Sequence, residues 1–402
     1  MDSVTLIGIG DVHFERDDGE SMFRHVQPFF DAADVVFANS EQVWGTGHAA
    51  ARAHATYPHP RGADVLAKVG IDVVSFANNH AMDWGAGGLL ATLQLAAGAG
   101  VRTVGAGATL AQARRPVVVE RNGMCIGFLA YACTGPASYA AEGDRAGYAP
   151  VHATTRYEQV DSQPGTPPRI HTTPVAGHVA AMAEDIGDLR RRVDAVVVSF
   201  HWGLHFVPAV IPDYCFAVGR AAAAAGATLV LGTHAHMLKG VEIHDGVPIF
   251  YGTGNFAFEM GLLPEHRHGL DEVLAWLTSH YRFALDPAYP TFPQHPDGRY
   301  TMMVEARFGQ GGLRDLAIVP CLVNTRSEPV PVRRGTPEAD EVVAYLRWVT
   351  REERLNAAFD WIDDARLAVR ADPGVPSRPT PADAAAMEPT AAASAPATSM
   401  SC

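Results

Sequence analysis

The sequence predicts an α/β fold, and three features indicate it. Short apolar runs rich in Val and Ile recur along the chain and stop at polar residues or glycine, as buried strands do. Ala-rich stretches of helical composition lie between these runs. The chain has 402 residues, of which 48% are hydrophobic and 19% are charged, so it can bury a full core. Strands that alternate with helices imply an α/β architecture.

The expected elements follow in chain order. The strands are "VTLIGIGD", "DVVFANSE", "DVVSFANNH", "CIGFLAY", "DAVVVSFHWG", "ATLVLGTHAH" and "VPIFYGTGNF". Helices are expected from Gly87 and from Tyr214, and each ends in glycine, the residue that most often closes a helix. Next, "YTMMVEARF" and "LRDLAIVPCLV" alternate like antiparallel strands. A last helix is expected from about Pro337 to Arg370.

Two segments interrupt this alternation and define the expected domain organisation. The segment 135–177 is rich in Pro, Gly and Thr and is expected to be a long loop, while 261–299 combines an amphipathic helix with loop. Residues 1–325 are therefore expected to form the main domain, with these two inserts. Residues 326–371 form a C-terminal extension with a helix, and the Ala, Pro, Ser and Thr-rich tail 372–402 is expected to be disordered.

Composition limits the classes of partner. With 44 acidic and 31 basic residues the formal charge is -13, which argues against a nucleic-acid or anionic-membrane binder, and an anionic substrate would need a local positive centre. The five cysteines are scattered and indicate neither a disulfide framework nor a thiolate zinc site. The N-terminal "MDSVTLIGIGDVHF" lacks the basic region of a signal peptide, and no apolar run reaches spanning length. We therefore expect a cytoplasmic protein without a membrane anchor.

Five of the predicted strands end at side chains of metal-binding type. These are Asp11 and His13 in "GDVH", Glu41 in "NSE", Asn79 and His80 in "NNH", His201 in "HWG", and His234 and His236 in "THAH". Any one motif has an ordinary explanation as a turn or a helix cap. Together they indicate a ligand site, because the carboxyl ends of strands converge in α/β sheets. Oxygen and nitrogen donors without thiolate suit Zn, Mn or Fe. In an extended segment, the i, i+2 spacing would point His234 and His236 to the same side.

The motifs resemble those of the CapA family, the poly-gamma-glutamate capsule synthesis proteins, which belong to the calcineurin-like metallophosphoesterase superfamily. The resemblance rests on "GDVHF", "NSEQ", "DVVSFANNHAMDWGAGGL", "VGAGATLAQARRPVVVERNG", "VVVSFHWG" and "AGATLVLGTHAHMLKGVEIHDGVPIFYGTGNFAFE". It covers about residues 4–259, with a weaker continuation to about 323. It implies a four-layer α/β/β/α sandwich with the site at one edge.

The resemblance also implies a role for each strand-end residue. Asp11 and His13 would bind one metal, and Glu41 would take the place of the bridging carboxylate. The second metal would be held by Asn79, His201 and His234, while His236 returns to the first. His80 would act on the leaving group, and Asp83 is placed to orient it.

The chain departs from the family pattern at several positions. Many members have an apolar residue in place of His13, and Glu41 is one methylene longer than the superfamily's bridging Asp. His205 and Lys239 stand where the family commonly carries an acidic residue and a Gln. We expect both to line the substrate pocket together with Asn255 and Glu259. The membrane anchor usual in the family is also missing.

The resulting functional expectation is a soluble metal-dependent hydrolase with one or two divalent Mn, Zn or Fe ions. A metal-activated water would attack a phosphoester or a gamma-glutamyl-type amide, so the substrate would be an anionic small molecule or a gamma-glutamyl compound. Two alternatives remain open. One is a non-catalytic or assembly factor in poly-gamma-glutamate synthesis or export, and the other is acyl or peptidyl transfer at the same metal site.

Overall fold

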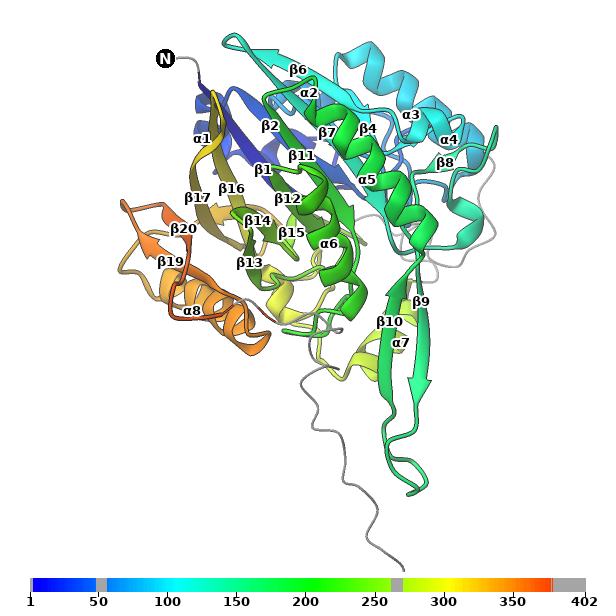
Figure 1. The fold of residues 1–402 in the computed structure, drawn as a ribbon, viewed down its shortest axis with the longest axis vertical. Helices are drawn as coiled ribbons and strands as arrows, with labels where there is room; N and C mark the ends of the chain where they lie inside the picture. The colour runs from blue at the N-terminus through cyan, green and yellow to red at the C-terminus, as the bar shows by residue number, and fades with distance from the viewer. Residues whose placement is uncertain (1–2, 48–55, 262–269, 377, 379–402) are drawn as a thin grey trace, which may run out of the picture.

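Two β-sheets packed face to face form the centre of the molecule, as the computed structural model shows (Figure 1). The structure describes residues 3–47, 56–261, 270–376 and 378. The larger, ten-stranded sheet has the order β19-β20-β17-β16-β1-β2-β3-β4, with β15 paired to β1 and β18 to β17. The smaller, six-stranded sheet has the order β13-β14-β12-β11-β7-β6.

The strands of the larger sheet are β1 (Ser3–His13), β2 (Val35–Ser40), β3 (Val73–Ser75), β4 (Arg102–Val104), β15 (Asn255–Phe258), β16 (Tyr300–Gly309), β17 (Gly312–Val323), β18 (Pro329–Pro331), β19 (Ala357–Trp361) and β20 (Leu367–Ala371). Those of the smaller sheet are β6 (Val117–Arg121), β7 (Met124–Ala132), β11 (Ala195–His201), β12 (Leu229–Thr233), β13 (Val241–His244) and β14 (Val247–Phe250). Two short pairs lie outside both sheets: β5 (Ala106–Gly107) with β8 (Gly147–Tyr148), and β9 (Ala153–Glu158) with β10 (Arg169–Pro174).

The helices are α1 (Gln27–Ala32), α2 (Gly62–Lys68), α3 (Gly85–Ala99), α4 (Leu110–Ala113), α5 (Ala176–Arg190), α6 (Asp213–Ala225), α7 (Leu270–Tyr281) and α8 (Pro337–Glu352), with 3₁₀ turns η1 (Gly19–Phe23), η2 (Ala137–Tyr139) and η4 (Pro296–Arg299). The predicted helix ends are confirmed for α3 and α6, which close at Gly100 and Gly226 in left-handed conformation. Among the described helices, none combines the length and apolar character that crossing a bilayer requires.

Side-chain alternation along the strands builds the layers. In β11, Val197 lies in the core between the two sheets, whereas Val196 and Val198 belong to the core beneath α5 and α6. Between the sheets, Phe37 of β2 stacks on Phe128 of β7 with ring centroids 5.7 Å apart. The neighbouring parallel strands β1 to β4 are joined through α1, α2 and α3, as parallel strands require a crossover connection. The expected α/β sandwich is confirmed.

The insert 135–177 differs from the expected long loop. It contains β8 and the β9–β10 hairpin, which extends away from the body of the molecule (Figure 1). The strands of the hairpin carry Thr, Tyr and Ile, which favour extended backbone. The Pro and Gly residues elsewhere in the insert obscured this signal. Tyr157 and Ile170 are 67% and 56% exposed, because among the described residues the two strands form a sheet with each other alone.

The C-terminal helix is also shorter than expected. It begins at Pro337, as predicted, and Thr336 is its N-cap. It ends at Glu352 and is followed by β19 and β20. "AAFDW" and "LAVRA" pair with each other, and β20 extends the larger sheet beyond β17, a tertiary contact that overrides helical composition. Most of the tail predicted to be disordered, 377 and 379–402, lies outside the described residues.

One apolar run predicted as a single strand contains two. "VPIF" is β14 of the smaller sheet, and "NFAF" is β15 of the larger one. Between them, Gly254 has a φ of +81°, and a Cβ there would meet the Tyr300 carbonyl oxygen at 2.8 Å. The chain changes sheets at this point, and the close approach of its backbone to Tyr300 admits only glycine.

Candidate metal centre

Parallel strands of both sheets bring the predicted donors to one edge of the sandwich. In the larger sheet Asp11 is in register with Asn39, immediately before the end of β2, and Glu41 follows. In the smaller sheet His201 is in register with Thr233, and His234 follows. Because the two sheets lie face to face, residues far apart in sequence meet at their carboxyl ends.

Glu41 belongs to two groups of side chains that could each hold a metal ion. One group is Glu41, His201 and His234, and the other is Asp11, Glu41 and His236; within each, the ligand atoms lie within 4.8 Å of one another. Glu41 Oε1 is 2.9 Å from His201 Nε2, and Glu41 Oε2 is 3.7 Å from His236 Nδ1. The two histidines of "THAH" thus fall into different groups, with the carboxylate between them.

The surroundings of Glu41 fit a cation. The residue is 1% exposed, and neither carboxylate oxygen has a hydrogen-bond partner among the described residues. Although burial alone would raise the pKa of Glu41, the imidazoles of His236 and His201 hold that pKa well below its usual range. A buried, ionised carboxylate whose contacts are imidazoles suits a divalent ion, which would bind the carboxylate and the imidazole nitrogens together. Carboxylate and imidazole donors suit Mn, Zn or Fe.

Asp11 is held by groups from both sheets. Its Oδ1 accepts a hydrogen bond from Asn39 Nδ2 at 2.7 Å, and its Oδ2 accepts one from the His234 backbone N–H at 3.0 Å. Burial, together with the charge of Glu41, raises the pKa of Asp11 well above its usual range. Asn39 was not predicted as a site residue, although its place in "NSE" at a strand end was a usable signal. It orients Asp11 in the way that supporting residues orient metal ligands.

His201 collects the donors of the second group. Its Nε2 lies 2.6 Å from Asn79 Oδ1 and 3.1 Å from His234 Nδ1. Its Nδ1 is 2.9 Å from Thr233 Oγ1, a contact that the sequence did not single out. Asn79, His201 and His234 therefore converge from three different strand ends, beside the shared Glu41.

His13 lies at the end of β1 but outside both groups of three. Its Nδ1 is 2.7 Å from the Glu259 carbonyl oxygen, which can only accept, so Nδ1 carries the proton. Its Nε2 then holds a lone pair, and this buried atom has no hydrogen-bond partner in the described part of the chain. Burial lowers the pKa of His13, which favours the neutral ring that metal binding needs.

The backbone at "THAH" differs from the extended path expected from the i, i+2 spacing. His234 and His236 have φ values of 82° and 56°, so both lie in the left-handed region in a bend after β12. For residues other than glycine this conformation costs on the order of 1–3 kcal/mol and persists where surrounding contacts impose it, often at functional sites. The bend, rather than strand alternation, orients the two imidazoles.

His80 and Asp83 form a pair at the rim of the site. His80 Nδ1 is 2.6 Å from Asp83 Oδ2, and this oxygen also accepts the Thr56 backbone N–H at 2.7 Å. The Asp83 side chain is fully buried, while that of His80 is 15% exposed. Asp83 thus orients an imidazole that reaches solvent.

The four predicted pocket residues occupy different environments. The His205 ring lies 5.3 Å from that of His234, and Asn255 Oδ1 is 2.8 Å from His236 Nδ1, so both adjoin the centre. Lys239 is buried and its Nζ donates to the Val207 carbonyl oxygen. The carboxylate of Glu259 pairs with Arg16 at 2.6 Å, whereas its backbone contacts His13 through the carbonyl oxygen and through its N–H, which donates to the His13 carbonyl oxygen at 2.8 Å.

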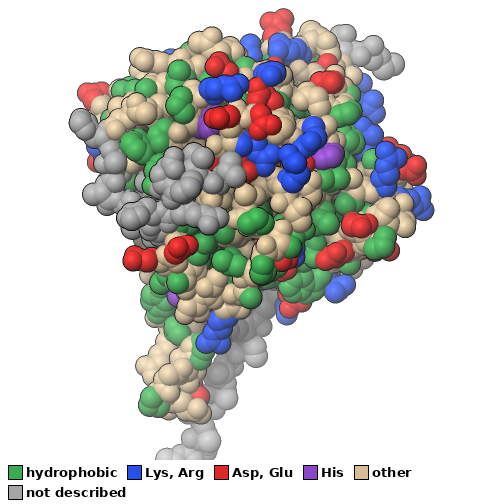
Figure 2. Space-filling model, turned by 180° about the vertical axis from the view of Figure 1, so that it is seen from behind, with side chains coloured by type: hydrophobic (Ala, Val, Ile, Leu, Met, Phe, Trp, Pro, Cys, Tyr) green, Lys and Arg blue, Asp and Glu red, His purple; other side chains and the backbone are tan. Residues whose placement is uncertain are grey.

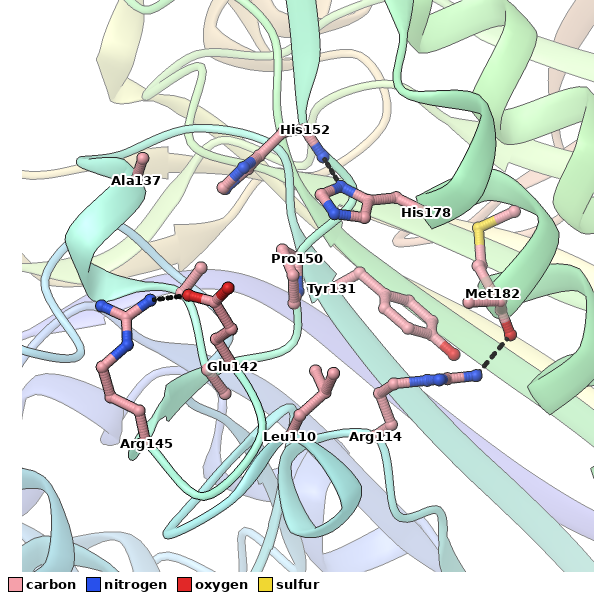
Figure 3. A pocket seen from close by; sticks show the side chains of 13 residues that line it. Leu110, Arg114, Tyr131, Ala137, Glu142, Arg145, Pro150, His152, His178 and Met182 are labelled. Atoms are coloured by element: carbon pink, nitrogen blue, oxygen red, sulfur yellow. Dashed lines mark hydrogen bonds and ion pairs between the residues drawn. The ribbon is translucent and has the colours of Figure 1, made fainter.

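A cavity of about 290 Å³ lies apart from these residues, between α4, β7 and α5 (Figure 3). Its two arginines are engaged: Arg114 pairs with Asp185 and Arg145 with Glu142. At the surface seen in Figure 2, basic and acidic side chains are interspersed. The clustered imidazoles and carboxylates at the strand ends are therefore the stronger candidate for chemistry.

Taken together, the fold and the strand-end cluster define an α/β sandwich that gathers His, Asp and Glu from both sheets at one edge. The chain belongs to the bacterial capsule synthesis protein family PGA_cap, whose family model matches residues 5–260.

Similar proteins were found by sequence and by structure. The PGA biosynthesis protein CapA of Bacillus subtilis (strain 168) is 28% identical over 61% of this chain and 59% of its own length. A protein of Mycobacterium tuberculosis (strain CDC 1551 / Oshkosh), named "Probable polyglutamine synthesis accessory protein", is 34% identical over 56% of this chain and 55% of its own. The chain thus spans less than two thirds of the length of these relatives. The solved calcineurin-like phosphoesterase YfkN from Bacillus subtilis aligns with a TM-score of 0.39 and 11% identity, covering 86% of this chain and 98% of that chain.

Proposed function

We propose that the protein is a metal-dependent hydrolase acting on a phosphoester or a gamma-glutamyl-type amide. The observation that carries the proposal is the position of Glu41, a buried carboxylate shared by two donor groups and without hydrogen bonds to either oxygen among the described residues. A closed structural site needs about four ligands around one ion, whereas a carboxylate between two groups suits a two-ion hydrolytic centre.

The proposed chemistry divides between the centre and its rim. When bound, divalent ions would supply Lewis acidity, which makes water a nucleophile near neutral pH and attracts an anionic substrate oxygen. Asp11 and Glu41 would hold the ions, with Asn79, His201, His234 and His236 as neutral donors and His13 Nε2 as a further one. His80 donates Nδ1–H to Asp83, so its Nε2 is the atom that would protonate the leaving group.

Metal content tests the centre. Glu41→Gln should lose both ions, because both groups share this residue, whereas His234→Ala should retain one. His178→Ala is a matched control, since His178 is a partly buried histidine beside the separate cavity. Metal analysis of the purified proteins measures this, with circular dichroism to confirm folding. A folded Glu41→Gln protein with wild-type metal content would refute the shared-carboxylate centre.

Hydrolysis tests the proton donor. The metal-loaded protein should hydrolyse generic phosphoesters or a gamma-glutamyl anilide, and a chelator should abolish the activity. His80→Ala should keep its metal but lose about 10²-fold in kcat, the usual contribution of a positioned general acid. The measurement is steady-state kinetics on wild type and variant. Equal kcat values would exclude the assigned role of His80.

A second candidate is an accessory role in polymer synthesis, and the names given to the two relatives favour it. The two functions can be distinguished by complementation in a host whose poly-gamma-glutamate synthesis depends on this chain. If hydrolysis is the function, His80→Ala should fail to restore polymer formation. If the role is accessory, His80→Ala should restore polymer, whereas a variant that disrupts the fold should not.

A further inference from the structure

A row of aromatic rings leads from the surface of α7 to the candidate metal centre. Trp276 stacks on His280, with ring centroids 4.9 Å apart and an interplanar angle of 12°. His280 and Trp276 both meet Tyr281 edge-on, at 4.8 and 6.1 Å. Tyr281 Oη is 2.8 Å from His205 Nε2. We call Trp276, His280, Tyr281 and His205 the aromatic row.

The inner end of this row contacts the metal-site histidines. The His205 ring lies 5.3 Å from His234 and 6.2 Å from His236. Next to it, Phe206 stacks on His236 at 5.3 Å and 19°. Phe206 has a φ of 58°, and its N–H donates to the Ala235 carbonyl oxygen at 3.3 Å. Left-handed backbone at a bulky residue is uncommon, and here it seats the 205–206 segment directly against the "THAH" bend.

The outer end of the row is open to solvent. Leu277, Tyr281 and Phe283 pack against Phe206, Ala235 and Met237, so one side of α7 rests on the site loops. Trp276 is 53% exposed, and none of the α7 residues is buried. A large exposed aromatic side chain that continues inward to a candidate active site is a feature of ligand recognition rather than of core packing.

Two basic side chains near the site are engaged by groups outside the row. Lys239 is turned inward to the Val207 carbonyl, and Arg299 of η4 pairs with Asp286 at 2.9 Å and lies over the Tyr289 ring. The rings offer flat apolar faces, and at the inner end the Tyr281 hydroxyl lies 2.8 Å from His205 Nε2.

We propose that the aromatic row is a substrate subsite that binds an aromatic or similarly flat apolar group carried several bonds away from the hydrolysed one. The proposal rests on the proposed hydrolase function and deepens it by naming the substrate class. The anionic group would lie at the metal centre, the linker would pass His205 and Tyr281, and the ring would stack on the exposed Trp276. Offset stacking between rings of this size is favourable, and the edge-on Tyr281 closes one side of the row.

Binding of two phosphonates to the metal-loaded protein tests the subsite. Phenylbutylphosphonate and butylphosphonate share the anionic head and the linker and differ in the ring. Isothermal titration should show tighter binding of phenylbutylphosphonate by about tenfold, the order expected for one stacked ring. Trp276→Ala should remove most of that preference without weakening butylphosphonate, and Trp276→Phe should restore much of it. Tyr157→Ala, an exposed aromatic on the distant β9–β10 hairpin, is the matched control and should change neither affinity.

The outcomes distinguish this inference from the proposed function. Equal affinities of the wild type for the two phosphonates, no binding of either, or a preference unchanged in Trp276→Ala would overturn the subsite. Hydrolysis of phenylbutyl and butyl phosphate, both alkoxide leaving groups, and of a gamma-glutamyl anilide is measured in parallel. If none of the three is cleaved while the phosphonate preference holds, the hydrolase function fails and the subsite stands. If both esters are cleaved with no preference for the phenylbutyl ester in KM, the subsite fails and the hydrolase function stands.

Discussion

At the scale of single residues, Glu41 differs from the other buried acids in what surrounds it. Glu242 accepts hydrogen bonds from Arg220 and Tyr251, Glu259 pairs with Arg16, and Glu328 with Arg24 and Arg326. Each of these carboxylates is satisfied by donors of the chain. Glu41 is equally buried, but in the described part of the chain the side chains paired with its carboxylate are the imidazoles of His201 and His236, so a bound cation would be its natural partner.

The lowered pKa of Glu328 predicts how the stability of the fold depends on pH. Its hydrogen bonds from Arg24, Asn324 and Arg326 outweigh burial and lower its pKa to about 2. Because the folded pKa lies below the unfolded value, this stabilisation is complete above pH 4.5 and is lost as the pH falls toward 2. Glu328→Gln should lower the free energy of unfolding at pH 7 by about 1 kcal/mol, allowing for solvent screening of its exposed partners.

Urea titrations of wild type and Glu328→Gln at pH 7 and pH 3 measure this effect. The difference between the two proteins should shrink at the lower pH. Glu158→Gln is the control, since its partners are on the exposed hairpin and its contribution should be small at both values. A difference that stays constant between pH 7 and pH 3 would contradict the assignment.

At the scale of elements, the strands were predictable where periodicity and end residues agree. Strands β1, β2 and β11 are Val and Ile-rich runs that stop at polar residues, and the predicted donors Asp11, Glu41 and His201 lie at their ends. The β9–β10 hairpin was missed because Pro and Gly in its surroundings obscured the strand signal, and β19–β20 was missed because its place in the sheet depends on the tertiary contact with β17. The direction of Lys239 toward Val207 depends on a loop conformation that sequence does not encode locally.

Substitutions at Gly254 and Gly246 test the close backbone approach at the point where the chain changes sheets. Their φ values are +81° and +82°, but only a Cβ at Gly254 would strike backbone, the Tyr300 carbonyl oxygen at 2.8 Å. Gly246→Ala should cost about 1–2 kcal/mol from left-handed strain alone. Gly254→Ala should cost about 2 kcal/mol more, because backbone must also shift.

Thermal or urea unfolding of both glycine variants provides the comparison. Metal content should fall in Gly254→Ala, since Asn255 follows directly and contacts His236, but should be unchanged in Gly246→Ala. Equal losses of stability in the two variants would show that the close approach at Gly254 is unimportant.

At the scale of the whole molecule, the candidate centre takes ligands from both sheets. Asp11 and Glu41 come from the larger sheet, and His201 and His234 from the smaller one. Ions bound there would connect the two sheets at their carboxyl ends. Metal removal should therefore lower the stability of the entire fold rather than loosen one loop.

A chelation experiment measures this connection. At a free metal concentration 100 times Kd, binding adds about 2.7 kcal/mol per site to the free energy of unfolding. Adding chelator should lower the melting temperature of the wild type and leave that of Glu41→Gln unchanged. A wild-type melting temperature insensitive to chelator would argue against ions at this position.

The passage from β14 to β15 has a consequence for cooperativity. The chain leaves the smaller sheet at Phe250 and enters the larger one at Asn255, so only residues 251–254 separate the two. Two layers tied this closely cannot unfold one after the other without breaking the shared core that contains Phe37 and Phe128. The sheets should therefore melt as one unit, with equal calorimetric and van't Hoff enthalpies, and neither should be obtainable as a folded fragment.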